Sequence, residues 1–124
     1  MEMHGKAWGR TGLLYSTRYL QAHLLEVNAG GFCSEHRHGR KHNFFHVLKG
    51  RLEILVWPND QASVPDVTVL GEGGSTSLAP GVYHQFRALA DTLCIEIYEA
   101  AEVEEDIARR TEGGKGGKEW AGLP

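Results

Sequence analysis

The residues best suited to chemistry in this 124-residue chain are histidines that crowd into one short segment. Four of its seven histidines fall in the stretch HRHGRKHNFFH, at positions 36, 38, 42 and 46. Residues two apart on a β-strand point to the same face of the sheet, so His36 and His38 can aim both imidazoles at one point. Imidazole is a good ligand for borderline transition metals, and two such ligands need a third from elsewhere in the fold. The spacing therefore predicts part of a metal site, and His84 is the obvious further donor.

The segments that must position these histidines are short and are separated by glycine and proline. Several of them alternate or cluster apolar, β-branched and aromatic residues as strands do: Tyr19–Val27, Asn43–Lys49, Arg51–Trp57, Val67–Leu70, Tyr83–Ala88 and Leu93–Tyr98. Lys49 and Gly50 are expected to turn a hairpin between two of these strands. Short strands at regular spacing with such turns predict an all-β sandwich or barrel.

The composition is that of one ordinary globular domain, with 41% hydrophobic and 23% charged residues. A formal net charge of −3 gives no basic surface for phosphate backbones, so nucleic acid is not an expected partner. No apolar run is long enough to cross a bilayer, so no membrane association is expected. Cys33 and Cys94 lie in apolar or strand-like segments and no secretory leader precedes them, which favours the cytoplasm.

The C-terminal part of the chain differs in composition from the strands. Acidic residues begin and basic residues end the stretch 102–110 (EVEEDIARR), a charge order that favours a short helical turn. Beyond Glu112 the sequence GGKGGKEWAGLP offers little apolar surface to bury. We therefore expect one domain over residues 1–112, with its core motifs at about 20–98, and a Gly/Lys-rich flexible tail over 113–124.

Two motifs surround the three histidines. The first, G-x5-H-x-H-x3,4-E-x6-G, is matched by Gly30, His36, His38 and Gly50. The second, G-x5-P-x-G-x2-H-x3-N, is matched by Gly74, Pro80, Gly81 and His84, with one residue fewer between the proline and the glycine. With both motifs in order, the sequence resembles the cupin superfamily. The resemblance implies a single cupin-type double-stranded β-helix (jelly-roll) barrel that holds one divalent ion (iron, manganese, copper, nickel or zinc) on His36, His38 and His84.

The sequence departs from these motifs at two positions. Asn43 stands where the first motif has its glutamate, and Ala88 replaces the asparagine that ends the second. An amide oxygen is a neutral and weaker ligand than a carboxylate, so three imidazoles with Asn43 would keep the full charge of the ion. We expect Asn43 to face the ion, bound to it or one water away. The alternative is a bulge after His38 that brings in His42 as the fourth ligand.

A candidate catalytic group lies in the strand LCIEIYE. Alternation puts Ile95 and Ile97 on one face and Cys94, Glu96 and Tyr98 on the other. If the second face lines the barrel interior, Glu96 is a candidate general base or a partner of a ligating histidine. A position facing solvent or a dimer contact is the alternative for this carboxylate.

The cupin resemblance leaves three classes of function open, because one scaffold hosts many reactions. The leading hypothesis is a metal-dependent enzyme of the dioxygenase type acting on a small organic molecule, since three neutral ligands leave positions open for substrate and dioxygen. The second is a metal-dependent isomerase or lyase in which the ion is a Lewis acid. The third is a non-catalytic module that binds a small ligand.

The N-terminal segment favours self-association. Residues 6–19 carry Trp8, Leu13, Leu14 and Tyr15 ahead of the first strand of the motif region. A small barrel cannot bury all of these side chains alone, so we expect a homodimer formed through paired strands or packed sheets.

Overall fold

The computed structural model describes residues 1–101 and 106–116, and those residues form two antiparallel sheets. The strands are β1 (His4–Lys6), β2 (Gly9–Ser16), β3 (Leu20–Val27), β4 (Gly31–Phe32), β5 (His36–Arg37), β6 (His42–Lys49), β7 (Leu52–Trp57), β8 (Asp66–Leu70), β9 (Ser75–Leu78), β10 (Tyr83–Ala88), β11 (Thr92–Glu99), β12 (Ala108–Arg109) and β13 (Gly114–Lys115). The all-β class expected from the sequence is confirmed. Within these residues no helix is long and apolar enough to span a membrane.

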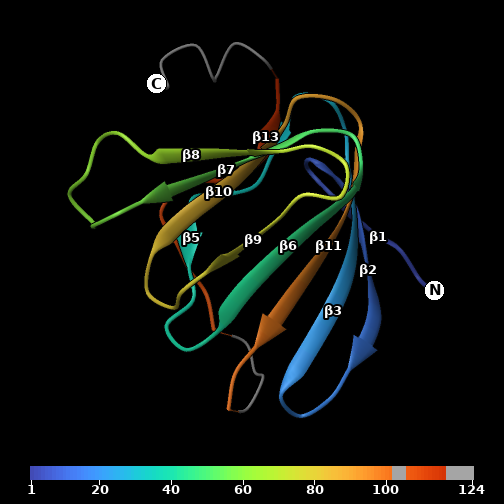
Figure 1. Ribbon diagram of the computed structural model, residues 1–124, viewed down its shortest axis with the longest axis horizontal. Coiled ribbons are helices and arrows are strands. Elements are labelled where there is room, and N and C mark those ends of the chain that lie inside the picture. The colour runs from blue at the N-terminus through green and yellow to red at the C-terminus, as the bar shows by residue number, and fades with distance from the viewer. Residues whose placement is uncertain (102–105, 117–124) are drawn as a thin grey trace.

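The first sheet has the order β1-β2-β3-β11-β6-β9, and the second is built around β10. One edge of β10 pairs with β7, which pairs with β8, and its other edge pairs with β4 and β5 in turn. In Figure 1 the first sheet lies below the second, and the β7–β8 hairpin projects to one side. The expected strands are therefore present as β3, β6, β7, β8, β10 and β11, with ends that differ by a few residues at most.

The core lies between the two sheets and follows the alternation of the strands. Asn43, Phe45 and Val47 of β6 point inward, and so do Cys94 and Glu96 of β11. Inward positions of β7 and β10 complete the apolar part with Leu52, Ile54, Phe86 and Ala88. Polar side chains thus share the interior with apolar ones at the end of the sheets where β6 begins and β11 ends.

The expectation of a hairpin at Lys49 and Gly50 is wrong, because β6 pairs with β11 and β9 whereas β7 pairs with β10 and β8. The turn at Gly50, which has a φ of +97°, instead carries the chain from the first sheet to the second. A Cβ atom at this position would lie 2.4 Å from the carbonyl oxygen of Asp91 and 2.6 Å from Thr92 Oγ1. Both the backbone conformation and the close approach of the neighbouring loop therefore require glycine here.

The N-terminal residues form a hairpin, β1–β2, that the sequence analysis did not place. Trp8 enters the core, where its ring meets the edge of Phe86 at a centroid distance of 5.1 Å. Leu13, Leu14 and Tyr15 are exposed, with Tyr15 62% accessible. The apolar surface anticipated for this segment is therefore present at those three residues but not at Trp8.

The segment 106–116, which we call the C-terminal strap, corrects the expectation of a helical turn over 102–110. Its described residues hold β12, in which Ala108 and Arg109 pair with Arg37 and His36 of β5. Pairing with an open strand edge satisfies more backbone groups than one helical turn, so it overrides the weak preference set by charge order. Residues 102–105 lie outside the described part.

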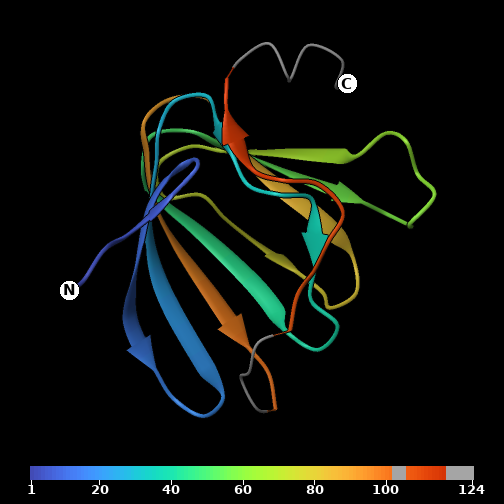
Figure 2. The same ribbon diagram turned by 180° about the vertical axis from the view of Figure 1, so that it is seen from behind.

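The strap continues into the stretch for which a flexible tail is expected. Gly114 and Lys115 form β13 and pair with Phe32 and Gly31 of β4. Figure 2 shows the strap, in red, running beside β5 along the second sheet. The strap thus forms the edge of that sheet beside β4 and β5, through β12 and β13. Residues 117–124 lie outside the described part.

Candidate metal centre

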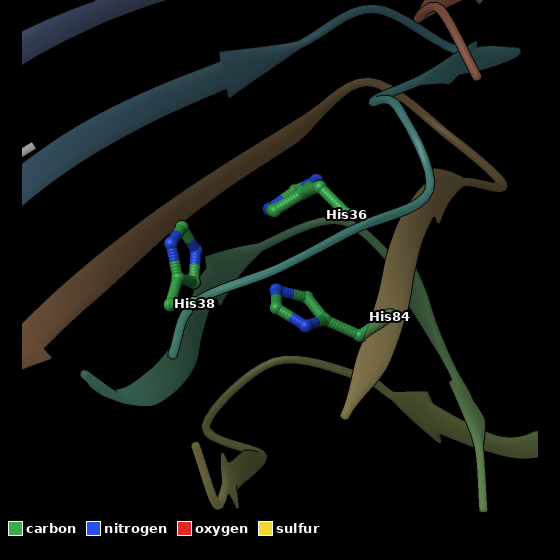
Figure 3. A group of neighbouring side chains, drawn as sticks. All are labelled: His36, His38 and His84. Carbon is green, nitrogen blue, oxygen red and sulfur yellow. The ribbon is translucent and has the colours of Figure 1, made fainter. Parts of the chain in front are cut away.

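The three histidines of the two motifs meet in the interior between the sheets. His36 of β5 and His84 of β10 are direct cross-strand partners, and His38 follows β5. Their ring centroids lie 4.4 Å apart for His36 and His84, 5.0 Å for His36 and His38, and 5.5 Å for His38 and His84. All three are buried, and Figure 3 shows the rings gathered around one point. The pairing of β5 with β10 therefore brings His84 to the two histidines whose spacing predicted part of a metal site.

Each imidazole is fixed through its Nδ1 atom by a main-chain carbonyl. His36 Nδ1 lies 2.7 Å from the carbonyl oxygen of Ser34, and His84 Nδ1 lies 3.2 Å from that of Val82. His38 Nδ1 lies 2.6 Å from the carbonyl oxygen of Asp106. A carbonyl only accepts, so each ring donates from Nδ1 and carries its lone pair on Nε2. This is the tautomer that a metal ion bound through Nε2 requires.

The Nε2 atoms of this group suit a shared ion. Those of His38 and His84 are buried and have no hydrogen-bond partner. One ring nitrogen from each of the three residues lies within 4.8 Å of the others, so the group could hold one metal ion. A buried polar atom without a partner is costly, and a metal ion would satisfy these atoms. The residues present therefore fit a divalent ion.

The protonation states of the rings agree with this role. Burial, together with the nearby His84 ring, lowers the pKa of His36 to about 3. Burial also lowers the pKa of His84 to about 4 and lowers that of His38. The desolvated site disfavours the imidazolium, so all three rings are neutral at pH 7 and able to ligate.

The structure distinguishes the two candidates for a fourth ligand by their positions. Asn43 is 1% exposed and donates from Nδ2 to Glu96 Oε2 at 2.7 Å, while its Oδ1 is buried without a partner. His42 is exposed on the opposite face of β6 and is not part of the three-histidine group. The ladder from Asn43–Tyr98 to His42–Glu99 is regular, so there is no bulge here to turn His42 inward.

Glu96 is a buried carboxyl group on the inward face of β11. Burial raises its pKa to about 7, against the opposing effects of hydrogen bonds from Tyr98 and Asn43. The predicted partition of this strand is correct, because Cys94 and Glu96 face the interior and Ile95 and Ile97 alternate with them. Glu96 can therefore exchange a proton near neutral pH.

A cavity of about 370 Å³ is lined by both Glu96 and His36, one of the three histidines. Its inner wall includes His36, Glu96 and Tyr98. Its outer wall comes from two segments remote in sequence, Lys6–Trp8 and residues of the strap that include Arg109 and Glu112. Because Lys6, Arg109 and Glu112 are exposed, the chamber is open to solvent through a charged mouth, and it is large enough for a small organic molecule.

The strap supports the site in ways that the sequence analysis missed. Asp106 accepts from His38 through its carbonyl, and its carboxylate accepts from the amides of Gly39 and Arg40 at 3.1 and 2.7 Å. The expected helix hid these roles, because only strand pairing brings Asp106 to the loop after β5.

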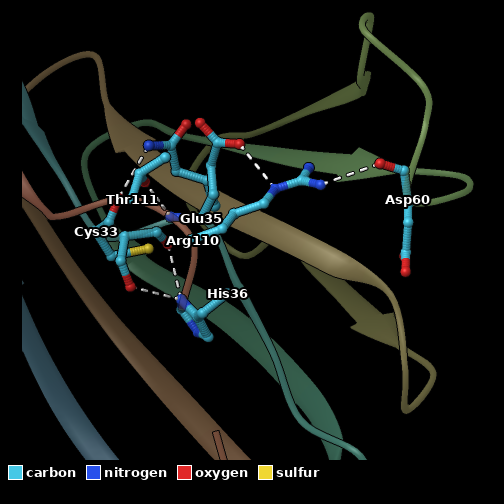
Figure 4. A network of polar contacts seen from close by, with 8 residues as sticks. Cys33, Glu35, His36, Asp60, Arg110 and Thr111 are labelled. Atoms are coloured by element: carbon cyan, nitrogen blue, oxygen red, sulfur yellow. Dashed lines mark hydrogen bonds and ion pairs between the residues drawn. The ribbon is translucent and has the colours of Figure 1, made fainter. Parts of the chain in front are cut away.

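A second set of contacts anchors the strap on the outer face of the sheet. The amide of Arg110 donates to the carbonyl of Glu35, whose own amide donates to Thr111 Oγ1 at 2.8 Å. The guanidinium of Arg110 bonds Glu35 and the carbonyl of Asp60, as Figure 4 shows, and lies 3.9 Å from the centre of the Tyr83 ring. These contacts fix the strap one residue away from Arg109.

Comparison with known proteins rests on structure alone. No protein-family model matches the chain, and no curated protein matches its sequence. The structure is similar to KdgF from Halomonas sp., with a TM-score of 0.71 and 17% sequence identity over 82% of this chain and 90% of that chain. It is also similar to oxalate decarboxylase from Bacillus subtilis, with a TM-score of 0.73 and 13% identity over 87% of this chain and 29% of that chain. A third similar structure is that of CapF with the inhibitor 3-isopropenyl-tropolone, with a TM-score of 0.74 and 17% identity over 89% of this chain and 34% of that chain.

The chain has the cupin fold. It spans most of KdgF but about a third or less of oxalate decarboxylase and CapF. At these identities the comparisons establish the fold alone, and the chemistry of this protein must be argued from its own residues.

The depressed histidine pKa values predict that the metal-free cupin loses stability in acid. As the pH falls below about 6.5, the unfolded chain binds protons on His36 and His84 that the folded chain excludes, so the free energy of unfolding decreases. Glu96 acts in the opposite direction between about pH 7 and 4.5, because its pKa is raised in the folded state. Relative to a His36→Gln/His84→Gln variant, the wild type should lose up to about 2.7 kcal/mol per pH unit.

Urea unfolding in EDTA at pH 7, 6 and 5 measures this difference, with the exposed His42→Gln as the matched control. Parallel pH profiles for the wild type and the double variant would show that the two rings are not held neutral.

Metal loading provides the direct test of the group. We expect one equivalent of Zn²⁺ or Co²⁺ per chain by calorimetric titration, and no stoichiometric binding by His36→Ala/His84→Ala, since one imidazole of the three would remain. His42→Ala should bind as the wild type does. Full loading of the double variant would exclude this site.

Asn43→Asp extends the same titration to the fourth position. If Oδ1 faces the ion, an anionic oxygen there should tighten Mn²⁺ binding. An affinity unchanged by the substitution would mean that Asn43 lies outside the ligand set.

Proposed function

We propose that this cupin is an enzyme that acts on a small organic molecule with the help of one divalent metal ion. His36, His38 and His84 would hold the ion, with Asn43 as a fourth ligand, directly or through one water. The observation that carries the proposal is the convergence of three neutral imidazoles, with partnerless Nε2 atoms on two of them, beside a chamber of about 370 Å³. Iron, manganese, copper, nickel and zinc all suit such a ligand set.

The ligand set determines what the ion can contribute. Three imidazoles and an amide carry no negative charge, so a bound ion would keep its full charge and act strongly on an oxygen atom of the substrate. This differs from a site with a carboxylate ligand, where part of that charge is neutralised. The protein then has to supply the groups that move protons.

Glu96 supports proton transfer as the reaction class, that of an isomerase or a lyase. Its carboxyl group lines the chamber with His36, and its pKa of about 7 lets it take up or release a proton at working pH. Asn43 and Tyr98 both bond it, which would hold one oxygen toward the chamber. We assign Glu96 as the general acid or base.

Oxygen chemistry of the dioxygenase type is the second candidate. The neutral ligand set supports it, because such a site leaves positions open for two further molecules. The name of oxalate decarboxylase associates this fold with a small diacid, which agrees with a chamber of this size. A non-catalytic module that binds a small ligand is the outcome if neither chemistry is found.

The reaction class can be tested by screening small organic acids with metal-loaded protein in D₂O. Proton transfer predicts deuterium incorporation observed by NMR, without oxygen consumption. Glu96→Gln should slow it on the order of 100-fold or more while leaving metal affinity within about twofold, and the exposed Glu99→Gln serves as the control.

Oxygen consumption that depends on the metal and survives in Glu96→Gln would reverse the order of the two enzyme candidates. Ligand binding with neither exchange nor oxygen uptake would support the non-catalytic module.

We also propose that the chain forms a homodimer through the outer face of its first sheet. Two rows of side chains cross β3, β11 and β6 on that face, Ala22–Ile97–Phe44 and Leu24–Ile95–His46, and Tyr15 of β2 extends the first row. These residues are mostly apolar and only half-buried, with Tyr15 fully at the surface. A continuous apolar face of this kind favours a self-complementary contact.

Sedimentation velocity at micromolar concentration tests the dimer. Ile97→Glu should convert it to monomer, because the substitution puts a charge in the middle of the contact. Val69→Glu, on an exposed strand of the other sheet, is the matched control. A wild-type protein that is monomeric throughout this range would contradict the proposal.

A further inference from the structure

Arg109 is aligned with two of the metal-site histidines by the register of the second sheet. In this sheet Arg109 of β12 lies opposite His36 of β5, which lies opposite His84 of β10. Directly opposed residues on antiparallel strands project to the same face. Arg109 therefore lies on the same face of the sheet as His36 and His84, and its exposed side chain lines the chamber together with His36.

The guanidinium of Arg109 has no partner among the residues that the structure describes. The adjacent Arg110 differs, since it bonds Glu35 and Asp60 and stacks on Tyr83 on the outer face. The contacts of Arg110 thus fix the strap, while the guanidinium of Arg109, with five N–H donors, lines the chamber without a partner among the described residues. Its charge also helps to lower the pKa values of His36 and His38.

The charges around the chamber favour an anionic guest. Lys6 and Arg109 stand at its mouth, and a divalent ion at the histidines would add two further positive charges. The lining also contains two carboxyl groups, those of Glu112 and of Glu96, and burial raises the pKa of Glu96 to about 7. A negatively charged molecule that reaches from the mouth to His36 would offset this excess.

Resting on the proposed function, we infer that Arg109 binds the carboxylate of a small organic acid whose neighbouring oxygen lies at the metal position. The planar fork of a guanidinium matches a carboxylate through two parallel hydrogen bonds, which a neutral amide or alcohol cannot provide. The substrate class is therefore a hydroxy or keto acid rather than a neutral sugar or diol. Arg109 sets this specificity without serving as a ligand of the ion.

Calorimetric titration of Zn²⁺-loaded protein with glycolate and with its neutral analogue glycolamide tests the inference. We expect glycolate to bind more tightly than glycolamide. Arg109→Gln should weaken glycolate binding on the order of 10- to 100-fold, the range of a charged hydrogen bond, and leave glycolamide and Zn²⁺ binding unchanged. Arg109→Lys should give an intermediate glycolate affinity, and Arg51→Gln, an exposed arginine outside the chamber lining, should match the wild type.

The possible failures are distinguishable. If wild-type protein takes up no Zn²⁺, the proposed function itself fails. If Zn²⁺ binds but glycolate does not, or binds equally to wild type and Arg109→Gln, the inference about Arg109 alone is overturned. Loss of Zn²⁺ binding in both Arg109 variants, with the fold intact by circular dichroism, would also overturn it and make Arg109 a residue that positions β12.

Discussion

The site depends on one repeated interaction, a hydrogen bond from an imidazole Nδ1 to a main-chain carbonyl. It fixes the tautomer and the orientation of His36, His38 and His84 at once. Without it each ring could turn or shift its proton to Nε2, and the lone pairs would no longer converge. Because all three acceptors are backbone atoms, the fold itself, rather than further side chains, prepares the site for an ion.

Two of these carbonyls are local and one is not. Ser34 and Val82 each lie two residues before the histidine that they hold, so the strand conformation alone provides them. Asp106 lies 68 residues after His38 and reaches it only because the strap pairs with β5. The same pairing brings Arg109 to the chamber, so one strand edge supplies both support for a ligand and the cation at the mouth.

Much of this arrangement could be predicted from the sequence, and the reasons are local. Strands such as β6 and β11 carry clear alternation, so the inward positions of Asn43 and Glu96 follow from the period of two. The spacing of His36 and His38 and the placement of His84 after Pro80 and Gly81 identified the three histidines that meet in the candidate metal centre. The preference for Asn43 over His42 as the inward-facing residue has the same basis. Adjacent residues of a strand point to opposite faces, so only one of the two can face the interior.

The parts that could not be predicted depend on which edges pair. Residues 108–109 are an alanine and an arginine, with no strand propensity of note, and the charges around them favour a helical turn in isolation. These two residues form a strand only because they pair with the open edge of β5. Register between distant segments leaves no trace in a single sequence, so the alignment of Arg109 with His36 was beyond sequence reasoning, as was the carbonyl of Asp106.

The distance along the chain between His38 and Asp106 also orders events during synthesis. His36 and His38 leave the ribosome before β10, and β10 leaves before the strap. The nascent chain can therefore bring two imidazoles together early, gains the third with β10, and can hold His38 in its final orientation only after residue 106 has emerged. Closing such long loops is slow compared with local folding. The chamber can thus be completed only after the strap has emerged, later than the sheets on which it rests.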